Sequence, residues 1–374
     1  MTTKKNKYFL DVNHEDVNSL SINQMTSIDW KLSSYHYKLP KSLIAQHPAP
    51  NRDQSRMLFV DRSKGIVTHC NFTDIIKLLP ENSCLVINDT RVLPVRLKGR
   101  RKTGAIIEAL LISESGEGHW IAVLRKAGRI KQGEKLDFCD GKICAVAFER
   151  KNGGEWLLKF EEPESLKERL EEFGLPPLPP YIKRLKSNEI QNAEDRERYQ
   201  TCFASKPGAI AAPTAGLHFT PEILDSIRDR GVEIIKVTLH VGLGTFTPIE
   251  KEDIREHDMH AEYYSISSNY LSKLKSFIRL QKPIICLGTT SVRVLETLAL
   301  NNFEINSGWT DLFIYPPYNF RIVKGLLTNF HLPKSTLLMM LSAFYGRKKL
   351  LDAYRLAVEE RYRFFSYGDC MLIL

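Results

Sequence analysis

Apolar residues in this chain fall into short runs that end in polar turns and lead into amphipathic segments. Runs with the length of a buried strand lie at 57–61, 85–87, 234–241, 283–288 and 326–329. Between them, apolar positions recur at helical spacing, as in Ile223, Leu224 and Ile227. Strands that alternate with helices are typical of an α/β fold. We therefore predict an α/β main domain formed by residues 28–94 and 163–374.

The pattern changes between residues 95 and 162, where five or six brief alternating runs are separated by glycine-containing turns. This spacing predicts a small all-β domain, most simply a barrel, inserted into the main domain. The basic tract Lys98–Lys102 begins the insertion and is either a solvated face or a contact for phosphates. A charged helix at 163–173 and the proline-rich stretch 175–184 are expected to lead back as a stiff connector.

The stretch from Gly208 to Phe246 is the centre of the predicted site. Residues between Ala211 and Gly216 are almost all small, so a ligand can come close to the backbone there. Thr220 and Pro221 then supply an N-cap and a first-turn proline, so the loop ends on a helix N-terminus. Such an end suits a phosphate or a carboxylate. The alternative is a tight loop with a well-capped helix and no ligand.

Three other strand ends carry polar residues. The strand at 85–87 runs into Asn88-Asp89-Thr90-Arg91, which is either part of a site or an Asx-turn that ends the strand. The strand at 283–288 leads to three hydroxyl residues and Arg293, and the strand at 326–329 leads to His331 and a helix capped by Ser335. If these loops meet at one edge of a sheet, they form a site for a ligand with charges and hydroxyls.

Composition narrows the class of protein. Its 374 residues are long for one core, so two domains are expected. The net charge of +9 favours a polyanionic partner. Seven cysteines without a CxxC pair argue against a disulfide framework or a zinc site. No apolar run has the length of a membrane span, and residues 1–27 are polar, so we predict a cytoplasmic protein with a disordered or wrongly assigned N-terminal extension.

Two weaker patterns point to other ligands. His257, His260 and Glu262 form an HxxHxE cluster that could hold a metal from adjacent helical turns, but no further cluster completes the shell and we predict no metal. The strand before Gly242 and Gly244 resembles the start of a nucleotide or S-adenosylmethionine loop, although a single GxG is weak evidence.

A series of motifs, in order from about Tyr37 to the last residue, closely resembles the S-adenosylmethionine:tRNA ribosyltransferase-isomerase family of the queuosine pathway. The motifs are YKLPKSLIAQHP, RDQSRML, NDTRVLPVRL, PLPPYI, RYQT, AAPTAGLHFT, TLHVGLGTF, EHDMHAE, GTTSVRVLE, TNFHLPKSTLLMMLSAF and FSYGDCMLIL. This resemblance implies an α/β domain with an inserted barrel, in agreement with the hydrophobic pattern.

The resemblance also implies a reaction. The ribosyl part of S-adenosylmethionine is transferred to the 7-aminomethyl group of 7-deazaguanine (preQ1) at the wobble position of tRNA. The product is epoxyqueuosine, and adenine and methionine leave. The implied substrates are therefore preQ1-bearing tRNA and S-adenosylmethionine, which is consumed, with no separate cofactor. We expect a monomer that does not bind membranes.

In such a reaction a proton beside the sulfonium must be removed and the acceptor amine must lose a proton, so at least one general base and one acid for adenine are needed. We assign these roles to the imidazoles of His218, His240 and His331, with Asp89 and Glu296 as carboxylates near the sulfonium, ribose or amine. Each histidine has the alternative of fixing a loop. The residues expected to bind substrate are Arg91, Tyr199, Thr214, Phe219, Gly242, Gly244, Thr289, Thr290, Ser291, Arg293 and Asn329.

Within this set, Thr289, Thr290, Ser291 and Arg293, and similarly Arg91, are expected to hold the methionine carboxylate or a tRNA phosphate; Tyr199 or Phe219 is expected to stack on a flipped-out base. Two other functions stay open. A methyltransferase would yield S-adenosylhomocysteine instead of adenine, but the acidic residue expected in that class at the end of the next strand is not evident in this chain. A non-catalytic RNA-binding protein would leave the polar loops unused and show no donor turnover.

Overall fold

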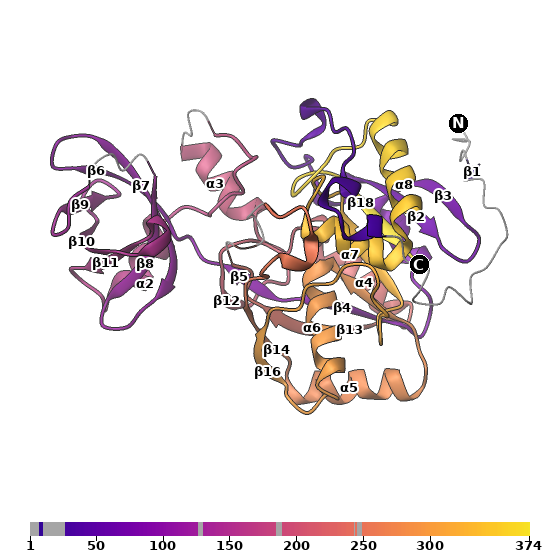
Figure 1. The fold of residues 1–374 in the computed structure, drawn as a ribbon. Coiled ribbons are helices and arrows are strands. Elements are labelled where there is room, and N and C mark those ends of the chain that lie inside the picture. The colour runs from indigo at the N-terminus through magenta and orange to yellow at the C-terminus, as the bar shows by residue number, and fades with distance from the viewer. Residues whose placement is uncertain (1–6, 10–26, 126–129, 185–188, 243, 245–248) are drawn as a thin grey trace.

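The computed structural model describes residues 7–9, 27–125, 130–184, 189–242, 244 and 249–374. A ten-stranded sheet forms the centre of the main domain (Figure 1). Its strands, in spatial order, are β1 Lys7–Phe9, β3 Ile66–Asn71, β2 Arg56–Asp61, β18 Cys370–Ile373, β17 Gly325–Asn329, β15 Ile284–Leu287, β4 Cys84–Asn88, β13 Glu233–Leu239, β14 Glu262–Ser265 and β16 Ser307–Thr310.

The middle of this sheet is parallel. β17, β15, β4 and β13 are neighbours that all run in the same direction, whereas β18 and β14 flank them in the antiparallel direction. The carboxyl ends of these four parallel strands therefore lie along one edge of the sheet. In open α/β sheets this edge is where ligands bind.

Helices cover both faces of the sheet. Successive residues of a strand point to opposite faces, so Val86 packs in one core while Leu85 and Ile87 pack in the other. The first core includes α5 Ser268–Arg279, α6 Gly288–Leu300, α7 Thr336–Tyr345 and α8 Arg347–Glu359. The second includes α1 Ile75–Leu78 and α4 Pro221–Asp229. This double cover explains why the central strands are apolar along their whole length.

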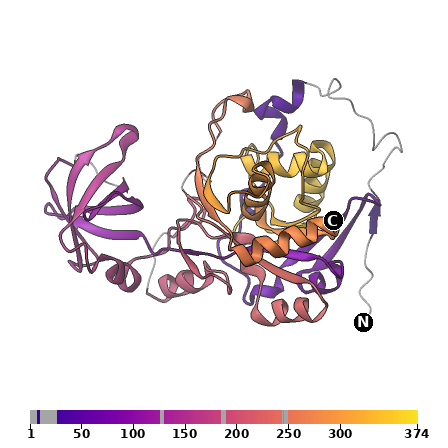
Figure 2. The ribbon, with the colours of Figure 1, turned by 90° about the horizontal axis from the view of Figure 1, so that it is seen from below.

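The inserted domain is a closed barrel that stands to one side of the main domain in both views (Figures 1 and 2). Its strands are β6 Arg96–Arg101, β7 Ile106–Glu114, β8 His119–Arg125, β9 Lys135–Phe138, β10 Ile143–Arg150 and β11 Trp156–Phe160. Helix α2, Leu166–Phe173, packs Leu166 and Leu170 into the barrel core, although it lies beyond the boundary predicted at residue 162.

The chain returns through an extended segment and α3, Glu189–Arg198. A short parallel pair then joins β5, Thr90–Val92, to β12, Lys206–Ala209, beside the barrel. Single 3-10 turns lie at Ser27–Trp30, Leu32–Tyr35, Lys41–Leu43, Arg52–Gln54, Phe72–Asp74, Asn152–Gly154, Thr214–His218 and Ile254–Glu256.

The predicted fold class is confirmed: an α/β domain carries an inserted all-β barrel. Most of the predicted extension, residues 1–6 and 10–26, lies outside the described residues; the short strand β1 pairs with β3. The prediction that the HxxHxE cluster lies on adjacent helical turns is wrong, because residues 257–261 have no regular secondary structure and Glu262 begins strand β14. None of the helices in the described ranges has both the length and the apolar character of a membrane span.

Candidate active site

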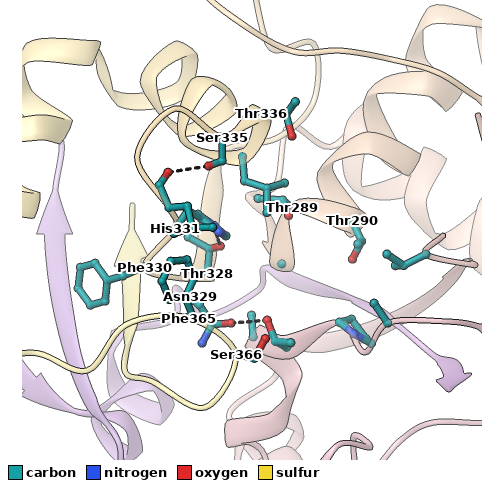
Figure 3. A pocket seen from close by; sticks show the side chains of 18 of the residues that line it. Thr289, Thr290, Thr328, Asn329, Phe330, His331, Ser335, Thr336, Phe365 and Ser366 are labelled. Atoms are coloured by element: carbon teal, nitrogen blue, oxygen red, sulfur yellow. Dashed lines mark hydrogen bonds between the residues drawn. The ribbon is translucent and has the colours of Figure 1, made fainter. Parts of the chain in front are cut away.

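A cavity of about 400 Å³ opens at the carboxyl ends of β15 and β17 (Figure 3). We call it the β15–β17 cavity. Its walls come from segments far apart in the chain, namely residues 180–181, 199, 211–215, 241, 249, 288–290, 328–337 and 365–366. Two of the predicted polar loops and the small-residue loop therefore meet at one place. The size suits a small organic ligand.

Two helix N-termini border this cavity. Helix α6 begins at Gly288, and Thr289 and Thr290 of its first turn line the wall. Helix α7 is capped by Ser335, whose hydroxyl accepts a hydrogen bond from the backbone N–H of Leu338 at 3.2 Å. Both helix ends carry partial positive charge, which suits a carboxylate or phosphate. Lys334 also lines the cavity and adds a full positive charge.

His331 lies in the same wall and is almost fully buried. Its Nε2 lies 2.7 Å from the hydroxyl oxygen of Thr328. Its backbone is held by two tyrosines, since its carbonyl accepts from Tyr37 and its N–H donates to the Tyr354 oxygen. Burial lowers the pKa of His331 to about 3, so the imidazole is neutral near pH 7.

His218 lies behind the cavity wall, at the end of a chain of hydrogen bonds. Thr214 donates to the amide oxygen of Asn329 at 2.8 Å, and the amide nitrogen of Asn329 donates to His218 Nε2 at 3.2 Å. His218 Nδ1 therefore carries the proton and donates to Ser55 at 2.9 Å. Burial lowers the pKa of His218 to about 4, with help from the nearby Arg363 and Arg52. Thr214 and Asn329 face the cavity, whereas His218 supports them.

Aromatic rings form the remaining wall. Tyr181 and Phe365 stack with their ring centroids 4.6 Å apart, and the buried ring of Tyr199 lies with them. Phe219 is fully buried and packs edge-on against Phe72 in the core between α4 and the sheet. The expectation that Phe219 stacks on a base is wrong, because no face of its ring is open.

A second polar group lies at the same edge, at the ends of β4 and β13. We call it the β4–β13 cluster: Asp89, Thr90, Ser205, Thr238 and His240. The Asp89 carboxylate accepts hydrogen bonds from Thr238 at 2.7 Å and Ser205 at 2.8 Å. Thr90 lies 2.8 Å from His240 Nδ1. Burial lowers the pKa of the half-buried His240, while the Asp89 charge acts in the opposite direction.

Glycine at position 208 makes room for this cluster. A Cβ atom there would lie 2.7 Å from the imidazole of His240, which is too close for any side chain. The cluster and the cavity are neighbours in the chain, since His240 precedes Val241, which lines the cavity. The backbone N–H of Ile210 also donates to the Val241 carbonyl at 2.8 Å.

Three predicted site residues point away from the cavity and serve the fold. The Glu296 carboxylate accepts hydrogen bonds from Tyr318 and from the backbone N–H groups of 321–323. Arg293 is buried in an ion pair with Glu262 and also donates to two carbonyls on the β16 side. Ser291 donates to the carbonyl of Leu287 within the helix start. None of these three residues lines the β15–β17 cavity.

The other predicted binding residues, Arg91, Gly242 and Gly244, are not part of the cavity lining. Arg91 forms a two-pronged ion pair with Glu171 of α2, at 2.7 and 3.1 Å, near the barrel. The N–H of Gly242 donates to Glu262 at 2.8 Å, and Gly244 lies directly against His260. Leu243 and residues 245–248 of the same loop lie outside the described residues. Across the described ranges, no three metal-ligating side chains gather at one point.

Several cavity residues are absent from the set that the sequence predicts. Tyr181, Thr328, Lys334 and Phe365 line the β15–β17 cavity, and each lies in one of the quoted motifs. Their motifs were the signal that could have identified them. Position in the motif alone does not tell which side chain faces inward, because that depends on strand register and on the approach of distant segments.

Comparison with known proteins agrees with this architecture. The sequence model of a family described as "Queuosine biosynthesis protein" matches residues 32–373. An S-adenosylmethionine:tRNA ribosyltransferase-isomerase of Halothermothrix orenii is 45% identical over 347 residues, covering 92% of this chain and 100% of that protein. One from Staphylococcus epidermidis is 47% identical over 346 residues, covering 92% and 99%. The crystal structure of S-adenosylmethionine tRNA ribosyltransferase from Thermotoga maritima is 36% identical, with a TM-score of 0.51, covering 91% of this chain and 100% of that one.

Proposed function

This chain belongs to the queuosine biosynthesis protein family as an S-adenosylmethionine:tRNA ribosyltransferase-isomerase, and we propose that its acceptor is the 7-aminomethyl group of preQ1 at the tRNA wobble position. The products are then epoxyqueuosine in tRNA, free adenine and methionine. The observation that carries the proposal is the β15–β17 cavity, which combines two helix N-termini with an aromatic wall. S-adenosylmethionine fits both features, because it has a carboxylate for an anion site and an adenine ring for a stacking surface.

We assign the donor to this cavity. The methionine carboxylate faces the N-termini of α6 and α7 near Lys334, and adenine lies against Tyr181 and Phe365. A neutral His331 suits this arrangement, because an imidazolium would repel the sulfonium. The hydroxyls of Thr289 and Thr290 are then available to the donor's polar groups.

We assign proton transfer to the β4–β13 cluster. The positive sulfur acidifies the C5′ hydrogens, so a base that takes one of them starts the opening of the ribose and the loss of adenine. His240 is unprotonated near neutral pH because burial lowers its pKa. Its Nδ1 is held by Thr90, so Nε2 transfers the proton, and Asp89 stabilises the imidazolium that forms.

The methyltransferase alternative loses support. In that class the strand after the GxG loop belongs to a parallel βαβ unit. Here the next strand, β14, runs antiparallel to β13, and the described residues between them form no α-helix, only the 3-10 turn Ile254–Glu256. The predictions of a cytoplasmic monomer that needs no cofactor and no metal remain predictions.

One incubation tests the function directly. The protein is mixed with S-adenosylmethionine and preQ1-bearing tRNA, and released adenine is measured by chromatography. We expect adenine only with the modified tRNA, together with a ribosyl mass increase on the tRNA. S-adenosylhomocysteine in place of adenine would identify a methyltransferase, and tRNA binding without either product would identify a binding protein.

A further inference from the structure

One large aromatic side chain is left outside the core at the edge of the main sheet. Trp309 lies on β16, the last strand of the sheet, and is 70% exposed. By contrast, Trp120 and Trp156 are buried in the barrel core. Full exposure of an indole is unfavourable in water. An exposed tryptophan beside a site for a large substrate therefore suggests a contact with that substrate.

Trp309 is the outer end of a row of rings that leads to the β4–β13 cluster. It pairs across the strands with Tyr263 of β14, and their ring centroids are 5.8 Å apart at 71°. Tyr263 in turn stacks on His240, with centroids 5.9 Å apart and planes 19° apart. The backbone fixes this order, because the His240 N–H donates to the Tyr263 carbonyl at 2.9 Å. Three adjacent elements thus present three rings in sequence.

We propose that this row, Trp309, Tyr263 and His240, is a stacking surface for unpaired bases of the tRNA anticodon loop. The proposal rests on the proposed function, because it takes the tRNA as the substrate. Every nucleobase has a flat face, so aromatic rings bind single-stranded RNA with little sequence preference. The row begins in solvent and ends at the imidazole to which we assign proton transfer, so a base beside the modified one would stack on Trp309 while the modified base enters the site.

Other occupants fit the surface less well. A second copy of the chain could pair with β16, since an edge strand has unpaired backbone groups. A stable dimer, however, needs an apolar surface much larger than one indole and one half-buried phenol. The chain carries a net charge of +9, which attracts a polyanion and repels another copy of itself.

Tryptophan fluorescence provides a test that does not depend on activity. Stacking of a base on Trp309 should quench its emission, and Trp309→Phe should remove that quenching while tRNA still binds. Titrations with unmodified tRNA, without S-adenosylmethionine, isolate the contact. If the quenching is unchanged in Trp309→Phe, it arises at another tryptophan and the proposal is wrong.

Kinetics provide a second test. Trp309→Ala should raise the Kd and KM for tRNA about 5- to 150-fold, the range found when a base–aromatic stack is removed, and leave the affinity for S-adenosylmethionine unchanged. Trp309→Phe should restore most of the affinity. Leu280→Ala, which removes another exposed apolar side chain just after α5, serves as the matched control and should behave as wild type.

The outcomes separate this proposal from the proposed function. Wild-type tRNA affinity in Trp309→Ala would overturn the stacking surface even if adenine is released normally. A change from dimer to monomer in Trp309→Ala, measured by sedimentation with tRNA affinity unchanged, would assign the surface to a second copy instead. If the tRNA quenches Trp309 but no adenine is released, the stacking surface stands and the catalytic function falls.

Discussion

The β15–β17 cavity and the β4–β13 cluster, at the same edge of the sheet, use the same residue types in different surroundings. At the β15–β17 cavity, His331 is almost fully buried, next to a hydroxyl and two helix N-termini. At the β4–β13 cluster, His240 is half-buried, next to Asp89 and continuous with rings that reach the solvent. Both groups follow parallel strands that end at one edge, so the sheet alone does not explain the difference.

The difference lies in burial and charge. Burial alone drives the pKa of His331 down to about 3, so this imidazole acts as a neutral hydrogen-bonding group. For His240, burial also lowers the pKa, so the imidazole is neutral near pH 7, but the Asp89 carboxylate opposes the effect and favours its protonation. One end is therefore suited to bind a cationic donor, and the other to move protons and admit a large acceptor.

The strongest test of this division is Asp89→Asn. Loss of the carboxylate that stabilises the His240 imidazolium should reduce kcat by up to the roughly 10²- to 10⁴-fold that general acid–base catalysis usually contributes, with the affinity for S-adenosylmethionine nearly unchanged. Wild-type kcat should decline in a pH range below the ordinary histidine pKa, because burial lowers the pKa of His240 and protonation there removes the base. Asp89→Asn should move that decline to lower pH, since the carboxylate raises the pKa of His240.

Ser205→Ala is the control for this substitution, because it removes one hydrogen bond to Asp89 and keeps the charge. Its kcat should fall far less. If Asp89→Asn weakens donor binding as much as it lowers kcat, or leaves the pH profile in place, the β4–β13 cluster does not perform the proton transfer.

A second test measures stability against pH. In the unfolded chain His331 has an ordinary pKa near 6.5, whereas in the fold its pKa is about 3. Between these values the unfolded state binds more protons, so the free energy of unfolding should fall as the pH drops, by about 1.4 kcal/mol per pH unit for this group. His331→Gln should make the slope between pH 6.5 and 4.5 shallower by about that amount, in urea titrations.

His240→Gln is the matched variant, because His240 is less buried. Its removal should change the slope by less than that of His331. Equal changes in the two variants would mean that the two ends of the edge do not differ in the way that their burial indicates.

Sequence was sufficient for features that depend on local chemistry. Thr220 and Ser335 were recognisable as helix caps, and each accepts the expected backbone hydrogen bond. The barrel was predictable from regular alternation and glycine turns. Parallel strands then bring the polar strand ends to one edge, as the α/β pattern implies.

Sequence was not sufficient for charged residues whose partners are distant in the chain. Glu296 and Arg293 are charged residues of the kind that active sites use. In the fold, however, Glu296 binds the backbone at 321–323, and Arg293 pairs with Glu262, 31 positions away. A buried charge must be satisfied wherever a partner becomes available, and only the fold determines that partner. The motifs identified the region, whereas the tertiary contacts separate ligand-facing side chains from structural ones.

The smallest expected effect concerns one hydroxyl of the cavity. Among the described residues, Thr290 Oγ1 is buried without a hydrogen-bond partner, although it lines the cavity. Buried hydroxyls are normally satisfied, so we expect this one to bind the donor. Thr290→Val should weaken S-adenosylmethionine binding about 2- to 10-fold and leave thermal stability unchanged, because no protein hydrogen bond is lost.

Thr297→Val in the same helix is the opposite case. It breaks a 2.6 Å hydrogen bond to Thr310 and should lower the free energy of unfolding by about 1 kcal/mol, with the affinity for S-adenosylmethionine unchanged. Calorimetric titration and thermal melts of both variants distinguish the cases, and wild-type donor affinity in Thr290→Val would remove this hydroxyl from the donor site.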